Sequence, residues 1–208
     1  MNTTKYDIVF IATYVDNTHI EDLVCSIIAN NDALKVLLLV LCQNGYCIER
    51  RNTAMVDMMT ICIPNKVGLS KARNICLHHI CENNIQFRYV MFPDDDSLFD
   101  RSFFLNFKSC VSGNTLIAVK ATQDRKSYFI KMPNKQMASK QDYKSAISVN
   151  MVISSQTLHQ VGDFDEELGV GCYYGAGEDN DYFIRCSKIE AFSFTNNIWN
   201  YHPLQKNK

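Results

Sequence analysis

The chain has 208 residues, of which 47% are hydrophobic and 21% charged, and its formal net charge is −1 at pH 7. A chain of this length buries one substantial core, and because no linker-like stretch interrupts it we expect a single domain over residues 1–208. The near-neutral charge excludes a general attraction to nucleic acid, so we expect no nucleic-acid partner.

Segments of strand length alternate with segments of helical periodicity in residues 1–99, which predicts a mostly parallel α/β sheet. The expected strands are 7–12, 35–41, 58–63 and 89–92, and the expected helices are 19–30 and 70–82. Residues 100–208 show a mixed pattern, with expected helices at 101–110 and 178–186 and strands at 116–119, 127–132 and 148–153.

No segment predicts a membrane span. The longest apolar run covers only residues 36–42, and the opening residues lack the pattern of a secretory signal. We therefore expect a soluble, cytoplasmic protein with at most peripheral membrane association.

Polar residues follow each of the first four expected strands. In an open parallel sheet, ligands bind beyond the carboxyl ends of the strands, so one crevice is expected to collect these residues. They are Thr13, Tyr14 and Asp16 after the first strand, Gln43 after the second, residues 64–70 after the third, and Asp94, Asp95 and Asp96 after the fourth.

The acidic run suggests a metal site. If the strand geometry continues past residue 92, Asp94 and Asp96 point to one side and Asp95 to the other. Two carboxylates on one side form a hard oxygen site that suits Mg²⁺ or Mn²⁺. Asp and Ser are also ordinary turn and capping residues, so this run alone leaves a solvated acidic loop as an equal alternative.

The helix that begins near residue 69 carries Lys71 and Arg73 close to its start. Cations there are unfavourable unless an anion joins them, and a diphosphate would accept hydrogen bonds from free N–H groups and from Arg73. If both side chains simply reach solvent, the cost is only some tenths of a kcal/mol. Taken alone, this fragment slightly favours the interpretation in which both side chains reach solvent. Together with the neighbouring acidic run, it favours binding of an anion.

A second acidic cluster comprises Glu178, Asp179 and Asp181, preceded by glycines and by Tyr173 and Tyr174. Helix capping explains one or two of these acids. The glycines and aromatic rings suggest in addition a sugar held close to the backbone. A carboxylate crowded by other acids has a raised pKa, which suits a general base.

The nine cysteines lie mostly in apolar segments and contain no Cys-x-x-Cys pair. This pattern favours reduced core thiols over a disulfide framework or a zinc site.

Taken together and in order, these motifs resemble family 2 glycosyltransferases of the GT-A fold over nearly the whole chain. The resemblance implies a Rossmann-like nucleotide-binding half, residues 1–99, and a mixed half for the acceptor and the catalytic base, residues 100–208. It implies that Asp94 lies near the ribose and the metal, that Asp96 ligates Mn²⁺ or Mg²⁺, and that Asp179 beside Glu178 is the base.

Other residues follow from the same resemblance. Some GT-A enzymes use a late histidine as a metal ligand, and His202 is placed for that role, with a free surface histidine as the alternative. Gln43 stands where the family often has an aspartate that contacts the nucleotide base. An amide still hydrogen-bonds uracil or guanine. The remaining expected contacts are Thr13, Tyr14, Asp16, Lys71, Arg73 and Asp95 to the nucleotide sugar, and Tyr173, Tyr174 and Asp181 to the acceptor.

The implied function is inverting transfer of a sugar from a nucleoside-diphosphate sugar, with a UDP-sugar favoured, to a hydroxyl of a glycan or lipid-linked acceptor. Such enzymes build surface polysaccharides or other glycoconjugates, here at the cytoplasmic face of the inner membrane. Two alternatives stay open: a metal-dependent nucleotidyltransferase acting on sugar phosphates, and a non-catalytic nucleotide-binding or glycan-binding module. The first usually needs a glycine-rich basic loop after the first strand, whereas residues 13–17 contain neither glycine nor cation. Nothing in the sequence indicates an oligomeric state.

Overall fold

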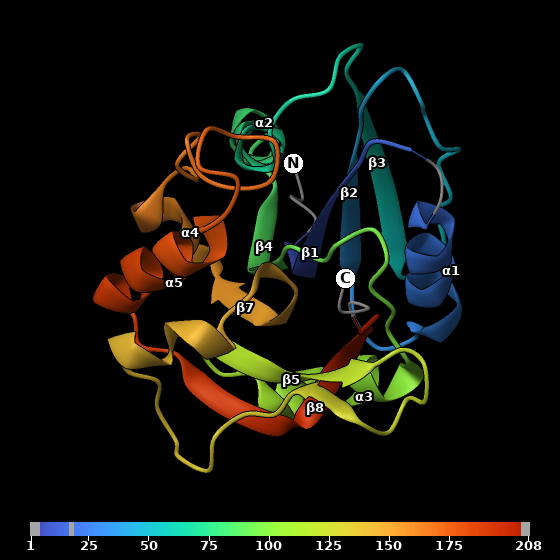
Figure 1. The fold of residues 1–208 in the computed structure, drawn as a ribbon. Helices are drawn as coiled ribbons and strands as arrows, with labels where there is room; N and C mark the ends of the chain where they lie inside the picture. Colours follow the sequence, from blue (N-terminus) through green and yellow to red (C-terminus); the bar gives the residue numbers. More distant parts are fainter. Residues whose placement is uncertain (1–4, 17–18, 205–208) are drawn as a thin grey trace.

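An eight-stranded sheet forms the centre of the computed structural model, which describes residues 5–16 and 19–204 (Figure 1). The strands are β1 Lys5–Tyr14, β2 Val36–Cys42, β3 Val56–Cys62, β4 Gln86–Met91, β5 Thr115–Ala121, β6 Tyr128–Ile130, β7 Met151–Ser154 and β8 Ser193–His202. The α-helices are α1 Ile20–Asn30, α2 Leu69–Glu82, α3 Arg101–Cys110, α4 Ser155–Val161 and α5 Glu178–Ile189, and two 3₁₀ turns are η1 Lys140–Ser145 and η2 Ser148–Asn150.

The strand order is β3-β2-β1-β4-β7-β5-β6, with β8 paired to β5. The first four strands are parallel, as predicted, with β1 between β2 and β4. The second half is mixed: β7 runs antiparallel to β4 and β5, β6 is antiparallel to β5, and β8 is parallel to it. The carboxyl ends of all four parallel strands therefore lie along the same side of the sheet.

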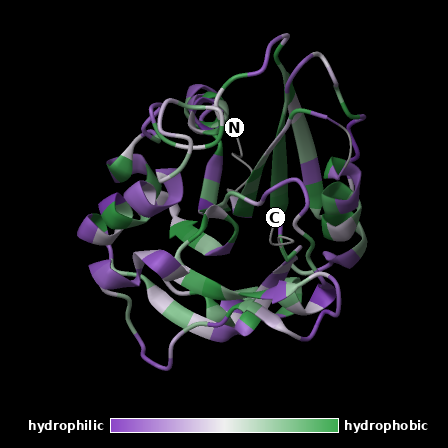
Figure 2. Ribbon diagram, viewed as in Figure 1, coloured by the Kyte–Doolittle hydropathy of each residue, from purple (hydrophilic) through white to green (hydrophobic). Residues whose placement is uncertain are grey.

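Helices cover both faces of the sheet, which explains why β1 and β2 are apolar almost throughout. Alternate residues of β1 face opposite cores: Phe10 belongs to the core that includes residues of α1 and α3, whereas Ile11 belongs to the core that includes residues of α2, α4 and α5. Figure 2 shows the hydrophobic residues concentrated along the strands. None of the helices within residues 5–16 and 19–204 is long and apolar enough to cross a membrane.

Most predicted elements are present with ends shifted by a few residues, but α4 and β8 were not predicted. The sequence of β8, SFTNNIWNYH, has no regular apolar alternation, because only its second half is largely buried. Its pairing with β5 also shifts register between Ile117 and Ala118. The segment expected as a strand at 148–153 begins instead as the turn η2 and becomes β7 at Met151.

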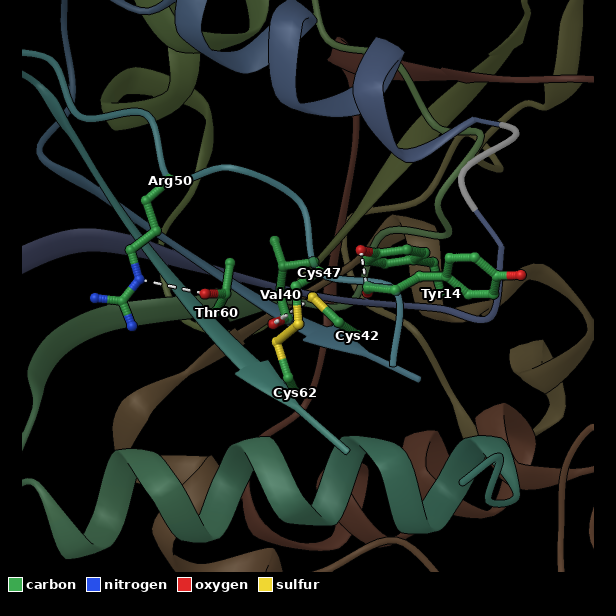
Figure 3. The surroundings of a disulfide bond; sticks show 8 residues. Tyr14, Val40, Cys42, Cys47, Arg50, Thr60 and Cys62 are labelled. Carbon is green, nitrogen blue, oxygen red and sulfur yellow. Dashed lines mark hydrogen bonds between the residues drawn. A yellow bond between two sulfur atoms is a disulfide. The ribbon is translucent and has the colours of Figure 1, made fainter. Parts of the chain in front are cut away.

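The prediction of reduced core thiols is wrong for Cys47 and Cys62, which form a disulfide between the loop after β2 and the end of β3 (Figure 3). The loop returns to the edge strand and brings the two Cα atoms to 6.2 Å, a separation that spacing in the sequence does not reveal. Cys25 and Cys81 are free but exposed, whereas Cys42, Cys76 and Cys186 are buried thiols as expected.

Candidate active site

A cavity of about 530 Å³ lies at the carboxyl ends of the parallel strands. It collects polar residues from segments that are far apart in the sequence, as the strand-end argument predicted. Its lining comprises Ile11, Thr13 to Asp16, Gln43, Lys66, Val67, Leu69, Arg73, Pro93 to Asp96, Ser148, Val170, Glu178, Asp179 and His202 to Leu204. Both halves of the chain therefore contribute to one cavity.

Three potential metal ligands meet at one end of this cavity. Asp94, Asp96 and His202 each offer one ligand atom, and these atoms lie within 4.8 Å of one another. The His202 Nε2 atom lies 3.3 Å from Asp94 Oδ2 and 3.3 Å from Asp96 Oδ1. His202 is only 8% exposed, so it is not the free surface histidine of the alternative interpretation.

The surroundings of His202 orient its ring. Its Nδ1 lies 3.0 Å from the Pro203 carbonyl oxygen, and the Phe129 ring stacks on it at a centroid distance of 5.5 Å. When Nδ1–H donates to that carbonyl, Nε2 keeps its lone pair directed at the carboxylates. Burial lowers the pKa of His202, but the hydrogen bond with Asp94 and the charges of Asp96 and Asp94 outweigh it, and the pKa is raised.

One oxygen of these carboxylates is buried without a hydrogen-bond donor among the described residues. Asp96 Oδ1 is buried and accepts no hydrogen bond from any residue the structure describes. Burial, more than the neighbouring Asp94, raises the pKa of Asp96, and burial together with Asp96 and Asp94 raises that of Asp95 to about 6. Two carboxylates and one imidazole fit Mn²⁺ or Mg²⁺, and a divalent cation there would offset this repulsion.

A buried arginine connects this end of the cavity to the second acidic cluster. Arg73 is 2% exposed, and its guanidinium lies 3.1 Å from Asp179 Oδ1, 4.0 Å from Glu178 Oε1 and 3.8 Å from Asp94 Oδ1. It also lies over the Phe164 ring, 5.2 Å from its centroid. One cation is therefore shared among three carboxylates.

Asp179 is held from two sides. Its Oδ1 accepts from Arg73, and its Oδ2 accepts from the backbone N–H of Ser148 at 2.9 Å. The contribution of Ser148 was not predicted, because a backbone donor leaves no signature in residue type. Burial, followed by the charge of Asp179, raises the pKa of the adjacent Glu178.

The other residues expected at the strand ends also line the cavity, namely Thr13, Tyr14, Asp16, Gln43 and Asp95. The Tyr14 hydroxyl is already engaged, because it donates to the Tyr46 carbonyl at 2.6 Å. Gln43 Oε1 accepts from the Val67 N–H at 2.8 Å, so the amide nitrogen is the part of Gln43 that is left for a ligand.

Four of the expected residues are not brought to the cavity. Lys71 is exposed and absent from the lining, where Lys66 is present instead. Residues two apart on a helix point in nearly opposite directions, so burial of Arg73 turns Lys71 outward. The other three are Tyr173 and Tyr174, which are 86% and 63% exposed, and Asp181, which accepts from Arg185 at 2.8 Å.

One glycine of the loop before α5, Gly169, packs closely against other parts of the chain. Gly169 has φ +102°, and a Cβ atom there would lie 3.2 Å from Glu178 Cδ and 3.2 Å from Ser70 Oγ. The Leu69 N–H donates to the Val170 carbonyl at 2.9 Å, so this loop is joined to the start of α2. Glycine therefore suits this position, because it adopts the positive φ without strain and adds no Cβ atom against Glu178.

No protein-family model and no curated protein sequence matches the chain. Solved structures do match its fold. The crystal structure of S. aureus TarS has a TM-score of 0.69 at 15% identity, covering 95% of this chain and 37% of that one. TarS residues 1–349 in complex with UDP-GlcNAc give 0.66 at 15% identity, covering 97% of this chain and 59% of that one. The mannosyltransferase PcManGT from Pyrobaculum calidifontis in complex with GDP-Man and Mn²⁺ gives 0.64 at 14% identity, covering 99% and 59%.

These similarities place the chain in a structural class. It has a mixed α/β fold with a mostly parallel central sheet, of the GT-A-like glycosyltransferase type. The chain spans between 37% and 60% of the length of these TarS and PcManGT structures.

Proposed function

We propose that this protein is a metal-dependent, inverting glycosyltransferase. It moves a sugar from a nucleoside-diphosphate sugar, with a UDP-sugar favoured, to a hydroxyl of a glycan or lipid-linked acceptor in glycoconjugate synthesis. The observation that carries the proposal is the meeting of Asp94, Asp96 and His202 with Glu178 and Asp179 in one cavity of a GT-A-like fold. Structural neighbours bound to UDP-GlcNAc, UDP, or GDP-Man with Mn²⁺ support a nucleotide-sugar donor.

Asp94, Asp96 and His202 are proposed to hold Mn²⁺ or Mg²⁺. When bound, the cation supplies positive charge that stabilises the diphosphate leaving group. Asp96 is assigned as a ligand because its buried Oδ1 atom accepts no hydrogen bond from the described residues and lies 3.3 Å from the His202 imidazole. Gln43 lines the cavity, and its amide N–H groups suit a carbonyl oxygen of uracil or guanine.

Asp179 is the proposed general base. Arg73 and the Ser148 N–H fix its orientation, and each carboxylate oxygen keeps a second lone pair for the proton of an acceptor hydroxyl. As that proton moves to Asp179, the hydroxyl oxygen bonds to the anomeric carbon and the bond to the diphosphate breaks. Attack from the opposite face inverts the configuration at that carbon.

The two halves have different proposed tasks. Residues 1–99 supply most donor contacts, including Thr13, Tyr14, Asp16 and Asp95, and residues 100–208 supply the base and the acceptor contacts. Tyr173, Tyr174 and Asp181 are proposed to contact the acceptor from outside the cavity, where the two exposed rings offer apolar faces for a sugar. Lys71 stays a weaker proposal, because it would have to reach a bound diphosphate from the exposed side of α2.

The test has two stages. A thermal-shift screen of UDP, GDP and dTDP, with Mn²⁺ and with a chelator, should show stabilisation by one nucleotide that depends on the metal. A panel of the matching nucleotide sugars should then release nucleoside diphosphate in the presence of an acceptor. Release of pyrophosphate from a nucleoside triphosphate and a sugar phosphate would instead indicate nucleotidyl transfer. Tight nucleotide binding without any product across the panel would indicate a binding module.

A further inference from the structure

Three cysteine sulfurs converge at the sheet edge where β2 and β3 end (Figure 3). Cys42 is the last residue of β2, Cys62 is the last residue of β3, and Cys47 lies in the loop that joins these strands. The three sulfur atoms lie within 4.8 Å of one another. This cluster, the three-cysteine site, is separate from the ligands Asp94, Asp96 and His202.

Strand pairing fixes two of the three sulfurs relative to each other. Cys42 and Cys62 are direct partners in the parallel ladder, so their side chains leave the same face of the sheet. The Cys42 thiol is buried and lies 4.0 Å from the Val40 carbonyl oxygen. Cys47 approaches from the loop and is bonded to Cys62, and both of these residues are exposed.

We propose that, once the Cys47–Cys62 disulfide is reduced, the three-cysteine site binds one soft metal cation, with Zn²⁺ as the representative ion. A thiol reductant opens the disulfide: two reductant thiols become one disulfide, and Cys47 and Cys62 each gain a proton and an electron. The cation then displaces the protons of the three thiols, which pass to solvent. The disulfide and the bound metal are alternative states of the same sulfurs.

The geometry suits thiolate ligation. Sulfurs bound to Zn²⁺ at ~2.3 Å in a tetrahedral site are about 3.8 Å apart. Reduction frees the Cys47 and Cys62 sulfurs to separate to this distance, and the Cys42 sulfur already lies within 4.8 Å of both. Exposed Cys47 and Cys62 give the ion a path from solvent, and water would complete the fourth position. Three thiolates select a soft ion, whereas the two carboxylates and one imidazole of the other site suit Mn²⁺ or Mg²⁺.

Cys42 distinguishes this proposal from a simple structural disulfide. A disulfide needs only Cys47 and Cys62, and a buried Cys42 would then be an ordinary small core residue. A metal site needs all three sulfurs. Loss of the Cys42 sulfur should therefore weaken metal binding at least tenfold and leave the disulfide intact.

The test is anaerobic titration of the reduced chain with Cd²⁺, followed by competition with Zn²⁺. The ultraviolet thiolate-to-metal absorption of Cd²⁺ reports sulfur ligands only and is blind to the Asp94, Asp96 and His202 site. We expect one ion per chain with the absorption of three thiolates, displacement by Zn²⁺, and no such band in the oxidised chain. Cys42→Ser should weaken binding at least tenfold, whereas Cys25→Ser and Cys81→Ser, exposed thiols elsewhere, should bind like the wild type.

If Cys42→Ser does not fold, Cys47→Ser removes a ligand from the exposed loop and should show the same loss. Mass spectrometry of the oxidised chain checks that Cys42→Ser retains the Cys47–Cys62 bond. The proposal is overturned if the reduced wild type gives no stoichiometric thiolate band, or if Cys42→Ser and Cys47→Ser both bind as tightly as the wild type.

Discussion

Replacing Arg73 by methionine removes a cation that Asp94, Glu178 and Asp179 share. Methionine keeps an unbranched apolar stem against the Phe92 and Phe164 rings but removes the guanidinium from all three carboxylates. Asp94 then keeps its contact with His202, and Asp179 keeps the Ser148 N–H. Removal of one member of a buried ion pair typically costs about 3–5 kcal/mol. The Asp94 and Asp179 side chains are 41% and 20% exposed, so water screens part of their charge and the lower end applies.

We therefore expect Arg73→Met to lower the free energy of unfolding at pH 8 by about 3 kcal/mol. For a chain of this size that corresponds to a fall in Tm of about 6–12 °C. The loss should be smaller at pH 5. Burial and Asp179 already raise the pKa of Glu178, and loss of Arg73 raises it further. A folded-state pKa above the unfolded value means that stability declines as pH rises between the two, so the deficit is largest at high pH.

Urea unfolding followed by the fluorescence of Trp199, the single tryptophan, provides the measurement. Lys71→Met is the matched control, because it removes an exposed cation from the same helix and should change stability by at most about 0.5 kcal/mol. Adding Asp179→Asn to Arg73→Met should recover part of the loss, because it removes one of the unpaired charges. A loss below about 1 kcal/mol, or a double variant with strictly additive losses, would contradict the shared-cation interpretation.

Four further predictions concern the cavity and its supports. Asp179→Asn should reduce turnover by orders of magnitude and leave the affinity for the nucleotide sugar near that of the wild type. The surface variant Asp32→Asn is the control. Unchanged turnover in Asp179→Asn would show that Asp179 is not the base. Asp96→Ala should abolish the Mn²⁺-dependent thermal stabilisation by nucleoside diphosphate, and wild-type transfer rates in this variant would rule out the metal assignment. Asp100→Ala should lower the free energy of unfolding by about 1–2 kcal/mol, because Asp100 caps α3 and accepts a hydrogen bond from Tyr201. Burial raises the pKa of Asp100, but hydrogen bonds from Ser102, Tyr201 and Phe103 lower it overall. The stability that wild-type Asp100 contributes is therefore present at neutral pH, and acid unfolding curves should show it shrinking as pH falls through the folded-state pKa. Gly169→Ala should lower the free energy of unfolding by about 1–3 kcal/mol, because alanine is strained at φ +102° and its Cβ would crowd Glu178. A melting temperature equal to that of the wild type would show that the loop can move to accommodate the Cβ atom.

The parallel half of the fold could be predicted because local sequence determines it. β1 and β2 are continuous apolar runs of strand length, and covering both faces with helices requires such runs. α3 begins after its capping residue Asp100 and was predicted at both ends. Parallel strands place their carboxyl ends at one edge, so Gln43 and Asp94 could be assigned to one cavity before any coordinates were known.

The remaining features depend on contacts between distant segments. The Ser148 N–H reaches Asp179 across 31 positions, and no residue type marks a backbone donor in advance. The Cys47–Cys62 disulfide follows from the return path of a loop. Helical spacing alone predicts that Lys71 and Arg73 point in different directions. Which of the two is buried depends on the carboxylates that α5 contributes, and this the sequence does not reveal.

β8 places one candidate metal ligand 108 positions after another, since His202 contacts Asp94 only when this strand lies along β5. The Leu98 bridge to Tyr201 joins the same two regions beside the acidic run. Contacts of such long sequence separation form late in folding, because loop-closure entropy opposes them until the intervening chain is ordered. During synthesis, residues 1–99 can therefore acquire their strands well before the proposed three-ligand metal site is complete, because His202 joins Asp94 and Asp96 only after β8 has docked.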